Sequence, residues 1–189
     1  MKRNSPSVKG LVLDCQNGLA SSKEKLYKTF YGYVMAVIIR YVNTADDAQE
    51  LVNDAFMKIF NHIDGFKGPE EEEGFAKSFK GWIAKVASRT AIDHLRKQKI
   101  NFETSEIEQA RSFVSIDPLT SNMEVAGIMS LLNQLPHSHK LVFNLYEVEG
   151  YSHDEISKML NIPASSSRVF LTRAKTKLRA LYASKFSTC

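Results

Sequence analysis

Apolar residues recur at helical spacing along nearly the whole chain, and this periodicity constrains the fold more than any other feature. Strand-like alternation over several residues is hard to find, and the prolines and glycines fall mainly between the periodic stretches. Between residues 100 and 122 the periodicity is lost and the sequence becomes polar. The pattern therefore predicts an all-α protein with two helical domains joined by a flexible linker.

Capping signals predict the helices of the first domain. Ser21–Glu24 has the form of a capping box and predicts a helix running to about Tyr41, and Thr44 is expected to cap a second helix. A long third helix is expected over residues 75–99. The acidic run at residues 70–73 is expected to stay solvated in the loop before it. The predicted buried face of the second helix comprises Ala48, Leu51, Val52, Ala55, Phe56 and Ile59.

The second domain is expected to contain a helix-turn-helix. Pro136 predicts a helix start, Gly150 its end, and Ser152–Glu155 a capping box that opens a short helix. A turn at Asn161–Pro163 follows, and then a longer helix, capped by Ser165 or Ser166 and ending near Tyr182. A short helix, a tight turn and a longer helix have the proportions of a helix-turn-helix, whose second helix enters the major groove.

Charge is distributed unevenly along this 189-residue chain of net charge +4. Residues 1–99 carry 16 Lys and Arg against 12 Asp and Glu, residues 100–122 carry 1 against 4, and residues 123–189 carry 8 against 5. Two basic blocks flanking an acidic connector are expected of two nucleic-acid-facing domains on a linker.

The last helix contains six basic residues and no acidic one after Ala164: Arg168, Arg173, Lys175, Lys177, Arg179 and Lys185. Leu171, Ala174, Leu178 and Leu181 are expected on its opposite, buried side. DNA binding is the favoured interpretation of this helix, because the caps, the turn and the charge agree. The alternative is a solvated basic face, since cations stabilise a helix C-terminus.

The first domain has two helices of opposite charge. Asp46, Asp47, Glu50 and Asp54 make the second helix suited to a basic protein surface. The third helix carries Lys77, Lys80, Lys85, Arg89, Arg96, Lys97 and Lys99 against Asp93 alone. Its aromatic residues Phe79 and Trp82 could stack on single-stranded DNA. Aromatic residues at helical spacing belong to the core more often, and Trp82 is expected there.

Several classes of protein are disfavoured by the sequence. Cys15 and Cys189 cannot form a four-ligand zinc site alone, and His137, His139 and His153 are expected to be loop histidines, so we predict no metal site. No phosphate-binding or nucleophile motif is found, and we predict a non-enzyme without cofactors. The apolar run Tyr33–Ile39 is far shorter than the roughly 20 residues of a membrane span, so a cytoplasmic protein is expected.

Three blocks of the sequence resemble the extracytoplasmic-function (ECF) sigma factors of bacterial RNA polymerase. Leu26–Phe66, with DAQELVNDAF at residues 47–56, is similar to the polymerase-binding segment of region 2. FKGWIA at residues 79–84 and ASRTAIDHLRK at residues 87–97 are similar to its promoter-melting and −10-reading segment. Leu135-Pro136, Val142-Phe143, EGYSHDEIS at residues 149–157 and Arg173–Lys175 are similar to region 4, which reads the −35 element.

The resemblance implies a role for each matching position. The residues that would dock on the coiled coil of the largest polymerase subunit are Asp47, Glu50, Leu51, Asn53, Asp54 and Phe56. Those at or near the −10 DNA would be Arg89, Thr90, Asp93, Arg96 and Lys97, and the loop at residues 65–74 would lie where the family captures a flipped base. Those facing the −35 duplex would be Ser165, Ser166, Arg168, Val169 and Arg173.

The sequence departs from the family's usual pattern at several of these positions. Thr90 stands where Asn is usual, and Val169-Phe170 replaces a polar and basic pair. The acidic run at residues 70–73 is unusual beside DNA. Ser165 and Asn161 stand where Gly is common, and Ser157 replaces Ala.

We therefore expect a sigma factor that binds core polymerase and promoter DNA, both duplex and melted. Residues 1–99 would form region 2, residues 100–122 the linker and residues 123–189 region 4. An anti-sigma factor is a further expected partner, because the family commonly has one. Two rival hypotheses are a free-standing helix-turn-helix regulator and a sigma-like interaction protein that sequesters a regulator. Val169-Phe170 on the expected DNA face favours the latter.

Overall fold

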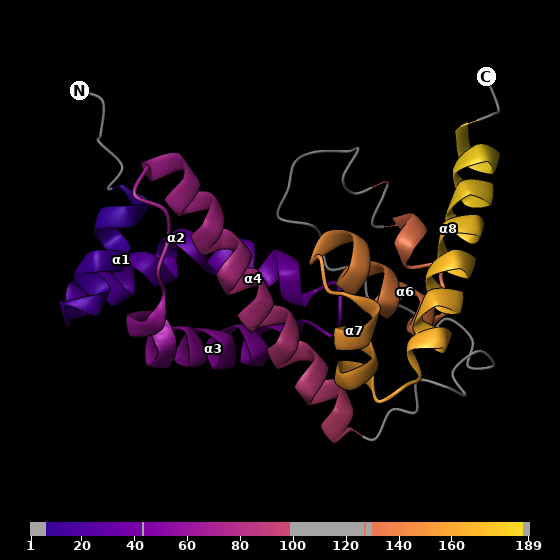
Figure 1. Cartoon of the computed structure of the whole chain (residues 1–189), viewed down its shortest axis with the longest axis horizontal. Helices are drawn as coiled ribbons and strands as arrows, with labels where there is room; N and C mark the ends of the chain where they lie inside the picture. The colour runs from indigo at the N-terminus through magenta and orange to yellow at the C-terminus, as the bar shows by residue number, and fades with distance from the viewer. Residues whose placement is uncertain (1–6, 43, 99–126, 128–129, 187–189) are drawn as a thin grey trace. The chain divides into compact units, whose positions relative to one another are not determined.

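The computed structural model describes residues 7–42, 44–98, 127 and 130–186, and every regular element among them is a helix (Figure 1). This confirms the predicted all-α fold class. The chain divides into two compact units: unit 1 comprises Met1–Ile39 and Ala45–Thr90, and unit 2 comprises Arg40–Thr44 and Ala91–Cys189. The predicted linker at residues 100–122 lies outside the described residues.

Unit 1 is built around a core shared by its long helices. Its elements are α1 (Val8–Gln16), α2 (Ala20–Ile38), α3 (Ala45–His62), the 3-10 turn η1 (Ile63–Gly65) and the larger part of α4 (Glu72–Lys97). The predicted inner face of α3 is confirmed, because all six of its residues are buried. Phe30 of α2 and Phe79 of α4 meet edge to face with their ring centroids 5.3 Å apart. Aromatic contacts of this kind add to the stabilisation that burial itself provides.

The start of the chain contains a helix for which no prediction was made. Val8–Gln16 forms α1, capped by Ser7, whose hydroxyl accepts a hydrogen bond from the Gly10 N–H. The predicted Ser21–Glu24 capping box is wrong, because α2 begins at Ala20 and has no side-chain cap. Leu19 opens the helix instead, and Ser22 is buried. Tertiary packing of α1 on α2 has here outweighed the local capping signal.

The acidic run differs in part from its prediction. Helix α4 starts at Glu72, so two of the four acids lie in its first turn, where the helix dipole favours negative charge. Glu71 accepts hydrogen bonds from the N–H groups of Glu73 and Gly74 at 3.0 and 2.9 Å. All four side chains are exposed. The expected solvation of the run is therefore confirmed, and the expected loop holds for Glu70 and Glu71 but not for Glu72 and Glu73, which form the first turn of α4.

Unit 2 contains α6 (His137–Phe143), the π-helical turn η2 (Asn144–Val148), α7 (His153–Leu160) and α8 (Ala164–Phe186). As predicted, Pro136 precedes the first helix, and Gly150 ends it with a positive φ of 74°. Leu141, Val142 and Leu145, which recur at helical spacing, are buried in the core. Helices α6 and α7 both pack against α8. The short stretch Arg40–Thr44 belongs to this unit, where Arg40 Nη1 lies 2.9 Å from Glu149 Oε1.

Candidate nucleic-acid interface

Helices α7 and α8 form a helix-turn-helix whose turn is fixed by local hydrogen bonds (Figure 1). The predicted capping box is present: Ser152 Oγ accepts from the Glu155 N–H, and the Glu155 carboxylate accepts from the Ser152 N–H at 2.9 Å. Asn161 ends α7 in the left-handed conformation with a φ of 53°. Asparagine tolerates this conformation better than most residues, so Asn161 can occupy a position where glycine is common. The Ser157 hydroxyl donates to the Ile162 carbonyl at 2.6 Å and closes the turn.

The second helix of this motif begins two or three residues before the predicted start. The Pro163 carbonyl accepts the Ser167 N–H at 3.1 Å, so Pro163 is the N-cap and α8 starts at Ala164. The prediction that Ser165 or Ser166 caps this helix is therefore wrong, since both lie within its first turn. The helix also continues past Tyr182 to Phe186.

His153 connects the two helices of the motif. Its ring Nδ1 lies 2.9 Å from the hydroxyl of Ser167 in α8, and its ring stacks on Tyr146 at a centroid distance of 4.5 Å. Burial, together with the nearby Arg168 guanidinium, lowers the pKa of His153. A neutral imidazole can keep this single hydrogen bond without a buried charge. His153 was predicted to be a loop histidine, but it is the first residue of α7 and is half-buried.

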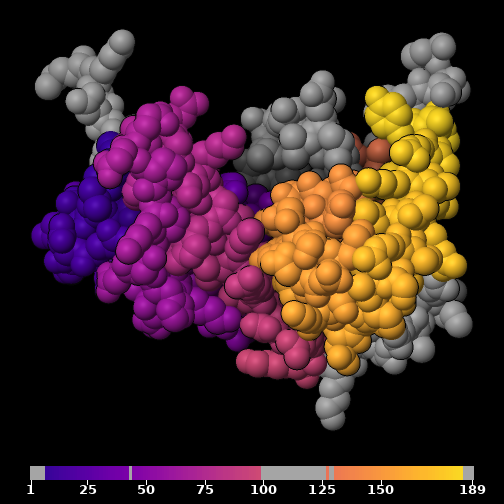
Figure 2. Space-filling view, in the orientation of Figure 1, coloured from indigo at the N-terminus to yellow at the C-terminus, as the bar shows by residue number. Residues whose placement is uncertain are grey.

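One side of α8 is exposed along its length, and its residues follow helical spacing. We call this the α8 stripe: Ser165, Arg168, Val169, Thr172, Arg173, Thr176 and Lys177. It contains four of the five residues expected at the −35 duplex, while the fifth, Ser166, is half-buried beside it. Thr172 and Thr176 were missed in the sequence, although they follow Arg168 at intervals of four residues. The yellow helix in Figure 2 displays its surface beside the orange surface of α7.

Phe170 does not lie on the exposed side of α8. It is only 7% exposed, and its ring centroid is 5.2 Å from that of His139. Val169 is 45% exposed and remains on the α8 stripe. Of the pair that favoured a sequestering protein, Phe170 therefore belongs to the core. The predicted inner side of α8 is correct for Leu171 and Ala174, which are buried. Leu178 and Leu181 are half-buried.

Helix α4 carries an exposed line of basic side chains in which two apolar residues are half-exposed. We call this the α4 stripe: Trp82, Lys85, Val86, Arg89, Asp93 and Arg96. The Arg96 Nη1 lies 3.8 Å from Asp93 Oδ1, so the one acid of the stripe is paired with one of its cations. Lys97 is exposed next to it.

Two residues of α4 differ from their predicted roles. Thr90 is 3% exposed, and its hydroxyl donates to the Val86 carbonyl at 2.8 Å, so the side chain is removed from the candidate DNA surface. Trp82 was expected in the core, but it is half-exposed, with one side packed on Phe66 and Phe79 at centroid distances of 5.3 and 5.7 Å. An indole held in this way has a fixed orientation and leaves part of its surface available for stacking on a base.

The outer side of α3 is acidic. Asp46, Glu50 and Asp54 are exposed, and Asp47 is half-exposed. Asn53 is exposed as well, and its side-chain oxygen accepts a hydrogen bond from the Tyr27 hydroxyl at 3.0 Å. We call Asp46, Asp47, Glu50, Asn53 and Asp54 the α3 acidic face.

Leu51 and Phe56 lie in the core of unit 1 and not on this face. Both are 2% exposed, and the Phe56 ring lies 4.6 Å from that of Tyr27. Because they are buried, they cannot contact a partner directly and can only stabilise the helix that carries the α3 acidic face. Met57 was missed in the sequence, yet it is 62% exposed and lies one turn beyond Asp54. Its spacing of seven residues from Glu50 was the available signal, because seven residues return to the same side of a helix.

Among the described residues, no three His, Cys, Asp or Glu side chains are grouped so that they could hold a metal ion. The helices within that part of the chain are also too short or too polar to cross a membrane.

Comparison with known proteins connects these surfaces to a family. The family model described as "Sigma-70 region 2" matches residues 26–100, and that described as "Sigma-70, region 4" matches residues 126–178. The chain is 26% identical over 177 residues to the ECF RNA polymerase sigma-E factor of Escherichia coli K12, covering 87% of this chain and 88% of that protein. It is 23% identical over 177 residues to the RNA polymerase sigma-H factor of Pseudomonas aeruginosa, with the same coverage of both chains.

A solved structure agrees at the level of the fold. The sigma factor RpoE of Bartonella quintana, solved in complex with the anti-sigma factor NepR, matches with a TM-score of 0.51 at 19% identity. The match covers 84% of this chain and 95% of that one.

Two helical units, the second with a helix-turn-helix bearing an exposed basic stripe, define a DNA-binding transcription protein. The family matches then make the class more specific. The chain belongs to the sigma-70 family and, within it, to the ECF sigma factors.

Proposed function

We propose that this ECF sigma factor directs transcription initiation by joining core RNA polymerase to a two-part promoter. The α3 acidic face binds a basic surface of the polymerase, the α4 stripe contacts the melted −10 strand, and the α8 stripe contacts the −35 duplex. The polymerase performs the phosphoryl transfer, and the sigma factor acts in the cytoplasm, where the polymerase is found.

One observation carries the proposal most strongly. The helix-turn-helix with its exposed α8 stripe lies within the residues matched by sigma region 4, whereas the α3 acidic face lies within those matched by region 2. A helix rich in carboxylates is repelled by phosphate and is suited to a basic protein surface. A free-standing regulator that binds only DNA would have no use for such a face. This difference favours a sigma factor over a regulator that acts without the polymerase.

Run-off transcription on a pool of genomic promoter fragments tests the proposal directly. Core polymerase with this protein is expected to give discrete transcripts that core alone does not give. Sequencing their 5′ ends would define the −10 and −35 elements. If folded protein with competent core gave no new transcript, a free-standing regulator or a sequestering protein would become the better explanation.

An anti-sigma factor remains an expected partner on the ground of the family resemblance. Purification of the tagged protein from its own cells would identify one as a stoichiometric companion that blocks run-off transcription when it is added back. A companion that leaves transcription unchanged would not be an anti-sigma factor.

A further inference from the structure

Helix α1 precedes the residues matched by region 2 and contacts the segment that leads into α4. We infer that Ser7, the N-cap of α1, and two residues within α1, Lys9 and Gln16, are positioning residues for −10 recognition: they hold the segment Phe66–Glu72 in place beside the α4 stripe. This inference rests on the proposed function and adds to it a source of control over the −10 contact.

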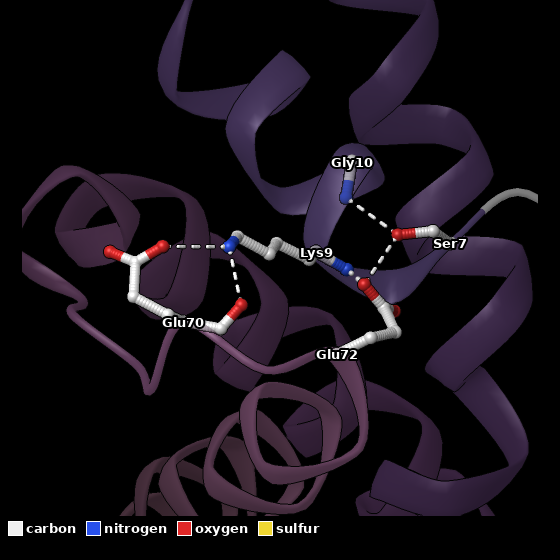
Figure 3. A network of polar contacts seen from close by, with 5 residues as sticks. All are labelled: Ser7, Lys9, Gly10, Glu70 and Glu72. Atoms are coloured by element: carbon white, nitrogen blue, oxygen red, sulfur yellow. Dashed lines mark hydrogen bonds and ion pairs between the residues drawn. The ribbon is translucent and has the colours of Figure 1, made fainter.

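At the start of α1, Ser7 and Lys9 make polar contacts with Glu70 and Glu72 (Figure 3). Lys9 Nζ donates to the carbonyl and to the carboxylate of Glu70, at 2.6 and 3.2 Å. The Ser7 hydroxyl donates to Glu72 Oε2 at 2.7 Å, and the Lys9 N–H donates to Glu72 Oε1 at 3.2 Å. These hydrogen bonds, that from Ser7 foremost, lower the pKa of Glu72, which shows that its charged form is the one they favour.

The C-terminal end of α1 holds the other end of the same segment. Gln16 Nε2 donates to the carbonyls of Ile63 and Phe66, at 2.8 and 3.0 Å. Ile63 is the first residue of η1, and Phe66 follows its last residue. Helix α1 therefore contacts the segment at both ends: its first turn binds Glu70 and Glu72, and its last residue binds Phe66. In Figure 2 the indigo surface of α1 accordingly borders the surface where α4 begins.

The segment itself is closely packed on α4. The Phe66 ring meets those of Phe75 and Trp82 at centroid distances of 5.4 and 5.3 Å. A Cβ atom added at Gly68 would come within 2.7 Å of the Phe75 ring, so only glycine fits there without a shift. Movement of the segment would therefore change the support of Trp82, the aromatic residue of the α4 stripe.

Charge gives the contacts a second consequence. Glu70–Glu73 is a run of four exposed acids at the start of a helix whose later turns carry the α4 stripe. Free carboxylates at this place would repel the DNA backbone or pair with the lysines of α4. Lys9 and Ser7 bind the carboxylates of Glu70 and Glu72 at the start of α1, so these two acids are paired there. Two of the four acids are therefore already paired, which lessens the repulsion that the run would exert on DNA at the proposed surface.

Individual surface ion pairs contribute little to stability, and in the Lys9–Glu70 pair the Glu70 side chain is fully exposed while that of Lys9 is half-buried. A variant of it should therefore leave folding intact and change mainly the position of the segment. Lys9→Glu places a third carboxylate beside Glu70 and Glu72. We expect about fivefold less open promoter complex at equal holoenzyme concentration, which corresponds to the net free energy of one or two lost hydrogen bonds. We also expect an altered tolerance to base substitutions in the −10 element and an unchanged tolerance in the −35 element.

The test compares wild type, Lys9→Glu, Glu70→Lys and the double charge reversal as full-length holoenzymes. Permanganate footprinting measures opening on a panel of −10 and −35 substitutions, while core affinity and thermal stability are measured in parallel. The inference expects the double reversal to recover at least half of the lost opening. Gln16→Met, which removes the donor at the other end, should alter the −10 profile in the same sense.

Three results would overturn the inference: an unchanged −10 profile in Lys9→Glu, an equal loss of −10 and −35 discrimination, or a loss of opening that follows core affinity or thermal stability. Wild-type holoenzyme separates this failure from that of the proposed function. If the wild type itself opened no promoter, the proposed function would fail and the inference with it. If the wild type opened promoters normally and Lys9→Glu had the same −10 profile as wild type, the inference would fail and the proposed function would stand.

Discussion

At the scale of single residues, the buried amine of Lys140 is the most unusual group in unit 2. Lys140 is 2% exposed, its Nζ donates to Asn133 Oδ1 at 2.9 Å, and desolvation lowers its pKa to about 8. Below pH 8 the folded and the unfolded chain both carry the charge, whose burial costs the fold roughly 3 kcal/mol. Above pH 8 the folded chain releases the proton before the unfolded chain does, so the unfolding free energy should rise with pH.

The lowered pKa predicts that Lys140→Met stabilises the fold at pH 7 and that its advantage shrinks by about 2 kcal/mol between pH 7 and 9.5. Urea unfolding of both proteins at the two pH values measures the difference, in which contributions from other titrating groups cancel. Lys158→Met provides the matched control, because Lys158 is exposed on α7 and should show no such dependence. A constant difference between wild type and Lys140→Met would mean that the amine is not neutral at pH 9.5.

Arg168 is the residue of the α8 stripe with the clearest expected role in reading bases. It is exposed in the second turn of α8, where helix-turn-helix proteins reach base edges. Arg168→Ala should weaken binding to the −35 element by about 1–3 kcal/mol and relax specificity there. Arg179→Ala is the control on the same helix, about 16 Å further along, and should weaken cognate and scrambled sequences alike. Footprints of Arg168→Ala and wild type with equal occupancy would contradict the prediction.

The burial of Lys140 was not predictable from the sequence, whereas that of Leu171 was. Helical spacing gives the direction of an apolar stripe but not its width, because width depends on how many neighbours pack against the helix. Phe170 lies four residues before Ala174 and therefore on the same side of α8, so its burial follows from a spacing that the sequence offered and that was missed. Helical spacing correctly predicted the burial of Leu51 and Phe56, although the family motif also places them in the polymerase-binding segment.

At the scale of elements, the helix-turn-helix was well predicted because each of its signals is local. A capping box, a residue in the left-handed conformation and a proline after it act within a few residues of one another. Helix α1 and the acidic segment were poorly predicted because they depend on each other across more than fifty residues. Neither has a strong local signal, and each is ordered by hydrogen bonds to the other.

The capping box of α7 gives a prediction at this scale. Ser152→Ala removes the hydroxyl that accepts from the Glu155 N–H, and it should lower the unfolding free energy by about 1 kcal/mol. Ser165→Ala should cost little, because Ser165 lies within the first turn of α8 and does not cap it. Denaturant titrations of the two variants compare the positions directly. An equal loss in both would indicate that the α8 start is less fixed than the Pro163–Ser167 hydrogen bond implies.

At the scale of the whole molecule, the two units are expected to have separable activities. The α3 acidic face belongs to unit 1 and the α8 stripe to unit 2, so a change in the first need not disturb the second. Asp47→Lys with Glu50→Lys reverses two charges of the α3 acidic face. Like charges placed against a basic polymerase surface cost several kcal/mol, so the double variant should lose detectable binding to core and all promoter-specific transcripts. Its binding to −35 duplex DNA as a free protein should stay within about twofold of wild type, since no residue of α7 or α8 is changed.

Three measurements on the same preparations test this separation: core binding, run-off transcription and duplex binding. Asp14→Lys is the matched control, an exposed acid of α1 outside the α3 acidic face, and it should retain all three activities. Loss of duplex binding in the double variant, with its thermal stability unchanged, would show that the DNA-binding unit depends on the α3 acidic face. Retained transcription would place the polymerase contact elsewhere on unit 1, with exposed Met57 and the neighbouring end of α3 as the next surface to alter.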